Sequence, residues 1–308
     1  MSEIIASAKK ITKIYKNQKV LDNIDLVIKS KQIHGLIGRN GAGKTTIMKI
    51  LSGLAFPTQG ELELFSKQKK DLNAVLKQVE ILIEHPGLFP EMSAYENLKA
   101  KCLSAGCFSK QYVYDLLKLV GIKLNDSKKA VKNFSLGMKQ RLGIAIALVG
   151  EPKLLILDEP MNGLDPQGFR EVSDTLVKLN EEKNITILIS SHILEKLANI
   201  ATYFTIIDNG KIIASLSKKE LNEKLGETLE LTIADSKKAS EVLEENYKNI
   251  RIEIVSSNIL HVKLENINKE DVLAKLSEMQ IKVQHYYQKD ISLEEYFLKL
   301  TSAEVKHV

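Results

Sequence analysis

The sequence has few cysteines and no long apolar stretch. Cys102 and Cys107 are its only cysteines, and they lack the second pair that a four-cysteine zinc site needs. No signal peptide precedes them, so we expect free thiols in a reducing compartment rather than disulfides or a cysteine-bound metal. The longest apolar stretches, such as LGIAIALV at 142–149, are much shorter than the roughly 18 residues that cross a bilayer. We therefore expect a soluble chain that reaches a membrane only through a partner.

Internal repeats and low-complexity tracts are also missing. The contents of 44% hydrophobic and 27% charged residues are those of a globular protein. A chain of 308 residues can hold one large domain and a smaller one. The net charge of +5 permits an anionic neighbour, although a solvated lysine-rich surface is the simpler explanation.

The order of the predicted elements indicates an α/β domain with a helical insertion. Strand patterns stand at 3–15, 21–28, 32–38, 153–160, 185–191 and 203–216. Helical patterns stand at 43–54, 93–106, 109–121 and 135–150. The first domain is therefore expected to span 1–225, with a helical subdomain at about 86–150.

A second, smaller domain is expected at 226–308. Its patterns alternate in the order β-α-β-β-α-β, which is typical of a ferredoxin-like α+β domain. A last helix is expected at 292–301, where Ser292 and Glu295 could form a capping box. No polar cluster in this part of the sequence suggests catalysis, and its role stays open between dimerisation, regulation and simple covering of the first domain.

The stretch GRNGAGKT fits the phosphate-loop pattern G-x-x-x-x-G-K-[ST] and lies between a predicted strand and a predicted helix. Glycines let backbone N–H groups curl around phosphate oxygens, and the helix start adds a partial positive charge. Lys44 would reach the β- and γ-phosphates, and Thr45 would bind Mg²⁺. The nucleotide-binding residues predicted here are Gly38, Arg39, Asn40, Gly41, Ala42, Gly43, Lys44, Thr45 and Thr46.

The stretch LLILDEP supplies the carboxylates that such a site needs. Four apolar residues place Asp158 at the end of a buried strand, where its carboxylate could hold Mg²⁺. Glu159 follows as a candidate general base, and His192, at the end of another predicted strand, could contact the γ-phosphate. Alone, the Asp-Glu pair could equally be an ordinary strand end. Together with the phosphate loop it predicts an ATPase centre.

The phosphate loop and the LLILDEP stretch, together with further motifs between residues 4 and 216, follow one another in the order found in the nucleotide-binding subunits of ATP-binding cassette (ABC) transporters. The sequence therefore resembles this family. The family's fold, a P-loop NTPase cassette, and its cofactors, ATP and Mg²⁺, are implied. Tyr15 resembles the aromatic residue that stacks on adenine, with a plain surface or core tyrosine as the alternative. Asp165 in NGLDP resembles the loop that links two active sites, and His192 the switch histidine.

FSLGMKQR, with Ser135 and Gly137, is similar to the signature sequence of the family. In the family this helix start points at the γ-phosphate held by a second subunit, so the resemblance implies a nucleotide-sandwich dimer with a second copy of the chain. A heterodimer with a related cassette stays open. Lys139 and Arg141 are expected on the surface of this helix.

Two departures from the family pattern concern turnover. Leu136 and Met138 replace a Gly and a Gln of the usual signature, which predicts slower hydrolysis. Glu84 stands where most relatives have a Mg²⁺-binding Gln. Its carboxylate could also bind the cation and would make activity more dependent on Mg²⁺ concentration, although a simple surface glutamate is an alternative.

The stretches IEHPGLFPEMSAYENL and FSLGMKQRLGIA resemble the bacitracin-resistance and lantibiotic-immunity exporters, whose cassettes pair with a separate ABC-2 type permease. This implies a cytoplasmic ATPase subunit, peripheral on the inner face of the cell membrane, that energises export of a peptide antibiotic or similar amphiphile. The alternatives are a soluble ABC ATPase, acting for example on nucleic acid, and a slow-hydrolysing switch. No nucleic-acid partner is expected, and the sequence leaves the cargo open.

Overall fold

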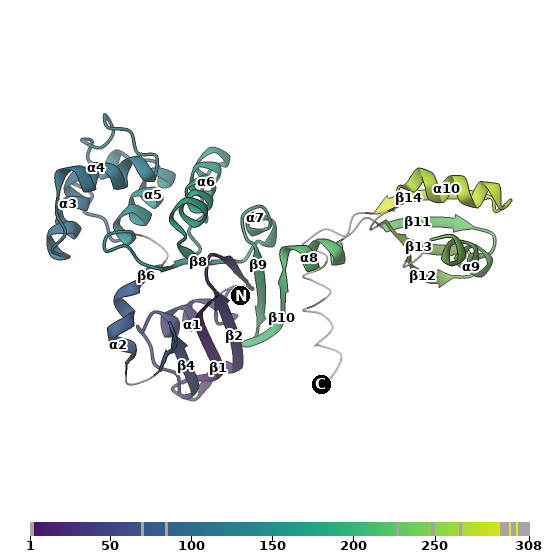
Figure 1. Cartoon of the computed structure of the whole chain (residues 1–308), viewed down its shortest axis with the longest axis horizontal. Helices are drawn as coiled ribbons and strands as arrows, with labels where there is room; N and C mark the ends of the chain where they lie inside the picture. The colour runs from purple at the N-terminus through teal and green to yellow at the C-terminus, as the bar shows by residue number, and fades with distance from the viewer. Residues whose placement is uncertain are drawn as a thin grey trace. The chain divides into compact units, whose positions relative to one another are not determined.

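The computed structural model describes residues 3–68, 71–83, 86–225, 228–247, 250–264 and 267–289, together with residues 296 and 300. The chain forms two compact units, 1–218 and 219–308, which we describe separately (Figure 1). This division falls one helix before the expected boundary at residue 226. Glu84 lies outside the described residues, as do Ser292 and Glu295 and most of the helix expected at 292–301.

The first unit is built on a six-stranded sheet in the order β10-β9-β3-β8-β7-β6, in which only β10 is antiparallel to its neighbour. All residues of the three central strands are buried, as expected for parallel strands covered on both faces. The strands are β3 (Ile33–Ile37), β6 (Val79–Ile83), β7 (Leu154–Asp158), β8 (Thr186–Ser191), β9 (Tyr203–Asp208) and β10 (Lys211–Ser217).

A second sheet of the first unit is antiparallel, in the order β2-β1-β4-β5. Its strands are β1 (Ile4–Tyr15), β2 (Gln18–Lys29), β4 (Gln59–Leu64) and β5 (Lys67–Gln68). Helix α1 (Lys44–Leu51) joins the two sheets, because its Ile47 and Leu51 belong to one buried cluster with Ile11 of β1 and Ile156 of β7. Burial on both sides fixes α1, and therefore the loop that precedes it.

The helical subdomain lies between β6 and β7 and contains α3 (Ala94–Ser104), α4 (Lys110–Leu119) and α5 (Leu136–Ala147) (Figure 1). A capping box of Ser93 and Glu96 starts α3. The sequence prediction did not include α6 (Pro166–Lys183), although Asp165 caps it and Pro166 opens it. The other helices of this unit are α2 (Leu72–Val75), η1 (Leu76–Gln78), η2 (Val131–Asn133) and α7 (Leu194–Ala198).

The second unit begins with α8 (Lys218–Leu225) and has an antiparallel sheet in the order β12-β13-β11-β14. Two helices pack on one face of this sheet, around Leu231 and Val262. The β-α-β-β-α-β order and this topology are those of a ferredoxin-like domain. The elements are β11 (Thr228–Ile233), α9 (Ser236–Asn246), β12 (Arg251–Ser256), β13 (Ile259–Lys263), α10 (Lys269–Glu278) and β14 (Val283–Lys289).

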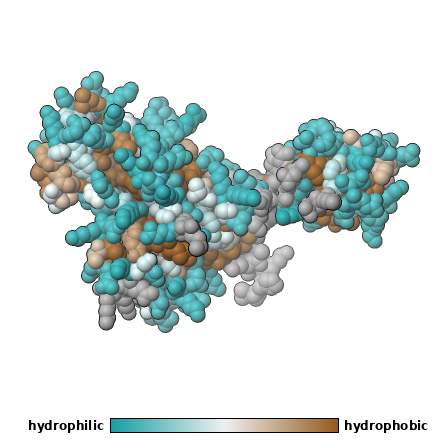
Figure 2. All heavy atoms as spheres, viewed as in Figure 1, coloured by the Kyte–Doolittle hydropathy of each residue, from teal (hydrophilic) through white to brown (hydrophobic). Residues whose placement is uncertain are grey.

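The surface is largely polar. Hydrophilic residues cover most of the viewed face of each unit, with hydrophobic residues visible in seams between them (Figure 2). Within the described part of the chain, no helix has both the length and the hydropathy that a membrane span requires.

Candidate active site

The loop between β3 and α1 needs glycine at several positions. A Cβ on Gly38 would lie 2.3 Å from the carbonyl oxygen of Ile207, and Gly43 has a φ of +107°. Helix α1 begins directly after Gly43 without a side-chain cap, so its first N–H groups face the loop unpaired by any cap. The loop therefore presents backbone donors at a helix start, which is a favourable place for an anion.

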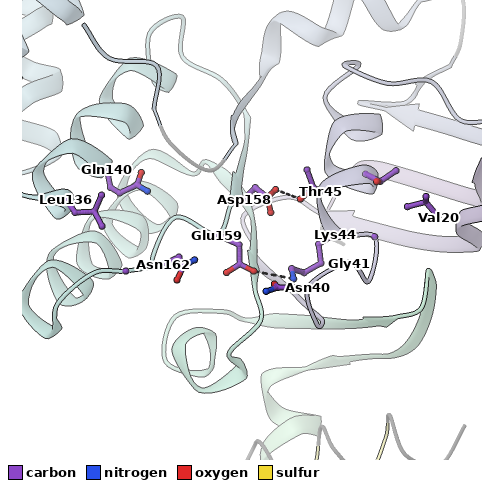
Figure 3. Close-up of a pocket in the computed structure, with 13 residues that line it drawn as sticks. Val20, Asn40, Gly41, Lys44, Thr45, Leu136, Gln140, Asp158, Glu159 and Asn162 are labelled. Atoms are coloured by element: carbon purple, nitrogen blue, oxygen red, sulfur yellow. Dashed lines mark hydrogen bonds and ion pairs between the residues drawn. The ribbon is translucent and has the colours of Figure 1, made fainter. Parts of the chain in front are cut away.

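Lys44 is the first residue of α1 and is only 6% exposed. Its Nζ donates to the carbonyl oxygens of Gly38 at 2.7 Å and of Arg39 at 3.2 Å. The same ammonium forms an ion pair with Glu159 Oε1 at 3.2 Å, drawn as a dashed line in Figure 3. The ammonium is thus held at the centre of the loop by groups that an arriving phosphate can replace.

Asp158 ends β7, and its carboxylate is buried. Thr45 Oγ1 donates to Asp158 Oδ2, and Ser190 Oγ donates to Asp158 Oδ1, each at 2.5 Å. The two hydroxyls come from α1 and β8, so three elements meet at this carboxylate. Figure 3 shows the bond between Thr45 and Asp158.

Glu159 adopts a left-handed backbone conformation with a φ of +51°, which is uncommon for a residue other than glycine. Its N–H donates to Ser190 Oγ at 2.9 Å. Its carboxylate lies between two nitrogens, since Oε1 pairs with Lys44 and Oε2 contacts His192 Nδ1 at 2.8 Å. His192 follows β8 directly, and its side chain is one-third exposed.

Lys44, Thr45, Asp158 and Glu159 border a pocket of about 650 Å³. The phosphate loop and α1 form one side of it, and Leu136, Gln140 and Asn162 lie across from them (Figure 3). The charged groups at its centre are one ammonium and two carboxylates, from Lys44, Asp158 and Glu159. The full lining comprises Val20, Asn40, Gly41, Gly43, Lys44, Thr45, Thr46, Leu136, Gln140, Asp158, Glu159, Asn162 and Gly163.

Eight of the described residues predicted for the site do not line this pocket, namely Gly38, Arg39, Ala42, His192, Tyr15, Ser135, Gly137 and Asp165. Tyr15 is 44% exposed, with the Lys13 ammonium 4.7 Å from its ring centre. Ser135 and Asp165 cap helices α5 and α6 through bonds to their own backbones. Gly137 is buried where the two helices meet.

Gly137 allows a close approach of α5 and α6. A Cβ on Gly137 would lie 3.1 Å from the Cα of Gly168 near the start of α6. Ser135, by contrast, is exposed. Within one chain, the start of α5 therefore presents its hydroxyl to the surface rather than to the phosphate loop.

The expectation that Arg141 lies on the surface of its helix was wrong. Arg141 is buried, donates to the carbonyl oxygens of Val120 and Gly121 at 3.2 and 2.8 Å, and pairs with Glu171 of α6 at 2.7 Å. Basic residues at helical spacing do not reveal in sequence which of them faces a neighbouring helix. Ser190 was also missed, and the only signal for it was a hydroxyl at the end of an otherwise apolar strand.

A glycine loop at a helix start, with an Asp-Glu pair at the same edge of a parallel sheet, defines a P-loop nucleotide-binding domain. A family model described as ABC transporter matches residues 21–162. The bacitracin transport ATP-binding protein BcrA of Bacillus licheniformis is 38% identical over 302 residues, covering 97% of this chain and 98% of that protein. The lantibiotic transport ATP-binding protein SrtF of Streptococcus pyogenes is 43% identical over 205 residues, covering 66% and 86%.

Among solved structures, CbiO1 from Clostridium perfringens, part of the ABC transporter complex CbiONQ, superposes with a TM-score of 0.65 at 28% identity. The match covers 71% of this chain and 90% of CbiO1. The chain belongs to the ABC transporter family as an ATP-binding and ATP-hydrolysing subunit.

Proposed function

We propose that the chain energises export of a peptide antibiotic, of the bacitracin or lantibiotic kind, through a separate ABC-2 type permease. The likeness to BcrA supports this, because it extends over 97% of the chain and therefore includes the second unit. The match to the methionine import protein MetN of Clostridium tetani covers only 69%. In this proposal the chain is peripheral on the cytoplasmic face of the membrane.

We propose that the pocket holds the phosphates of ATP. The backbone N–H groups at the start of α1 would bind phosphate oxygens, and Lys44 would exchange the carbonyl oxygens of Gly38 and Arg39 for the β- and γ-phosphates. The two carboxylates of the pocket exceed its single ammonium in charge. A nucleotide that arrives with a divalent cation relieves this excess. Tyr15 offers an exposed ring on which adenine could stack.

The oxygen donors of Thr45 and Asp158 fit Mg²⁺, a hard cation that proteins often hold through one or two carboxylates and the phosphates of the substrate. Among the described residues, no group of three or more His, Cys, Asp or Glu side chains could hold a metal alone. We infer that Mg²⁺ binds only together with the nucleotide. When bound, it neutralises charge on the phosphates. Glu84, also predicted as a ligand, lies outside the described residues.

We assign proton transfer to Glu159. Its carboxylate can accept a proton from a water molecule aligned with the γ-phosphate, while Lys44 and His192 hold its two oxygens in place. His192 is exposed enough to contact the γ-phosphate as well. Closure of the site around ATP would drive transport, and hydrolysis would reset it.

We further propose that the active form is a homodimer in which the start of α5 from one copy covers the nucleotide bound by the other. Ser135 and Asp165 of one copy would complete the site of its partner, and the exposure of both residues supports this. A slow nucleotide switch is the second candidate, because Leu136 puts an apolar side chain, 37% exposed, at the helix start that would face the phosphates.

Co-expression with an ABC-2 type permease in a bacitracin-sensitive bacterium tests the transport proposal. Resistance that depends on Glu159, and is lost in a Glu159→Gln strain, is the expected result. Membranes holding the complex should also hydrolyse ATP faster when bacitracin is added. If the rate of ATP hydrolysis is the same with and without membranes, permease and peptide, the transport role is contradicted and a soluble ATPase is favoured. Hydrolysis too slow to exceed one turnover in minutes would favour the switch.

A further inference from the structure

Ser190 lies near the end of β8, next to the two acidic residues of the site. The strand pairs with β7 in parallel register, so the two strands end at the same edge of the sheet. Ser190 is 1% exposed, and the three residues before it are buried and apolar. A hydroxyl in such a strand needs partners inside the protein, because a buried polar group without them destabilises the fold.

The Ser190 hydroxyl has two hydrogen-bond partners, which belong to consecutive residues. Asp158 ends β7, and Glu159 begins the turn that follows. The hydroxyl proton points to Asp158 Oδ1 at 2.5 Å, and the hydroxyl oxygen accepts the N–H of Glu159 at 2.9 Å. A serine hydroxyl has one proton to donate, so these two bonds fix its direction. The chain of bonds runs from the Glu159 backbone through Ser190 to the Asp158 carboxylate.

The bond to Glu159 holds the residue at its unusual backbone angle. Left-handed conformations of residues other than glycine persist only where the surroundings stabilise them. At a φ of +51°, the side chain of Glu159 leaves the turn toward Lys44 and His192. If the backbone relaxed, the carboxylate would move away from both nitrogens.

We infer that Ser190 is a positioning residue for ATP hydrolysis, which aims the Glu159 carboxylate and orients the Asp158 carboxylate through one hydroxyl. This inference rests on the roles proposed above for Glu159 and Asp158. In this role Ser190 contacts neither the nucleotide nor the attacking water. Its effect should therefore appear in the rate of hydrolysis and in the Mg²⁺ concentration required, more than in the affinity for ATP.

Three substitutions at Ser190 distinguish the effect of losing the hydroxyl from the effect of changing the side-chain volume. Ser190→Ala removes both bonds, while Ser190→Thr and Ser190→Val have nearly the same shape and differ in the hydroxyl. We expect Ala and Val to lower kcat about 10- to 100-fold, as small misplacements of catalytic groups do, and to raise the Mg²⁺ needed for half-maximal rate. Thr should recover most of the rate. Ser173→Ala is the matched control, because Ser173 is buried in α6 and its hydroxyl has no hydrogen-bond partner.

Hydrogen exchange at the Glu159 amide gives a second readout that needs no catalysis. The full chain without nucleotide should exchange this amide about tenfold faster or more in Ser190→Ala and Ser190→Val, with β3 amides unchanged. Unchanged exchange, or a kcat in the Val variant equal to that of Thr, would overturn the inference. If the wild-type chain hydrolyses no ATP, the proposed function fails, and the exchange result still decides whether Ser190 holds Glu159.

Discussion

At the scale of single residues, the carboxylate of Glu159 is shared between an ammonium and an imidazole. Lys44 is almost fully buried, so its charge needs a nearby counter-charge, and Glu159 supplies it at 3.2 Å. In this arrangement the glutamate keeps the lysine in place before any phosphate arrives. The same contact orients the glutamate for accepting a proton.

Glu159→Gln tests the assignment of the proton acceptor. A carboxamide of the same shape cannot accept the proton of water, so the hydrolysis rate should fall about 10²- to 10⁴-fold. ATP affinity should not fall, because the substitution removes negative charge beside the phosphates. Single-turnover hydrolysis and equilibrium nucleotide binding measure the two quantities. Glu181→Gln on the exposed face of α6 is the control. A rate within threefold of wild type would remove Glu159 from this role.

At the scale of elements, Arg141 connects three helices. It lies on α5, donates to the carbonyl oxygens at the end of α4 and pairs with Glu171 on α6. The carbonyl oxygens of Val120 and Gly121 follow the last residue of α4, where a helix leaves its carbonyl groups unpaired. A guanidinium suits this place, because its fixed fork reaches several acceptors at once.

We expect Arg141→Ala to destabilise the first unit by about 2 kcal/mol, since it leaves the buried carbonyl oxygen of Val120 and the half-buried one of Gly121 without their donor. The pair with Glu171 adds little, because that carboxylate is 38% exposed. Lys139→Ala on the same helix should change the free energy of unfolding by less than about 0.5 kcal/mol. Urea unfolding measures the free energy of unfolding of both variants. Equal values would show that the Arg141 guanidinium does not stabilise the first unit.

Strand β3, which leads into the phosphate loop, carries the buried histidine His34. Burial lowers the pKa of His34 from 6.5 to about 3, and its Nε2 bonds to Thr205 Oγ1 at 2.8 Å. The unfolded chain takes up a proton below pH 6.5, whereas the folded chain stays neutral to about pH 3. Stability is therefore full above pH 6.5 and falls as the pH drops through this window.

His34→Leu should flatten this pH dependence. The wild-type chain should lose about 2 kcal/mol between pH 7 and pH 5 through this one group, and the variant should not. Leucine also removes the unpartnered buried Nδ1, and Thr205 keeps a bond to Ser215 at 3.0 Å, so stability at pH 7 should change little. Urea unfolding followed by hydrogen exchange in β3 peptides measures the first unit alone. Parallel pH profiles for the two chains would contradict the assignment to His34.

At the scale of the whole molecule, the sequence predicts those features of the fold and the site that short sequence motifs determine. The phosphate loop and the Asp-Glu pair could be placed together, because parallel strands end at one edge of a sheet and both motifs follow apolar strands. The burial of Arg141 and the contacts of Ser190 could not, since they depend on which neighbours the fold brings to α5 and β7. Helix α6 could have been predicted, because Asp165, Pro166 and the apolar spacing of Val172, Leu176 and Leu179 mark it.

The homodimer proposal makes a prediction that only a shared site can satisfy. Ser135→Arg places a bulky cation at the start of α5 and leaves the phosphate loop and Glu159 of its own chain intact. Glu159→Gln does the reverse. Each variant alone should be almost inactive, because every site in either homodimer has one damaged half.

Mixing the two variants should restore activity. In a heterodimer, the phosphate loop and Glu159 of the Ser135→Arg chain face the intact α5 start of the Glu159→Gln chain, so one of the two sites is whole. An equal mixture holds heterodimers as half of its dimers, so activity should recover to about a quarter of the wild-type rate if the sites act independently. The control mixes Ser135→Arg with Lys44→Ala, which leaves the same α5 start intact and should recover equally well. A mixture as inactive as its components, with exchange of chains verified by mass, would mean that each chain completes its own site.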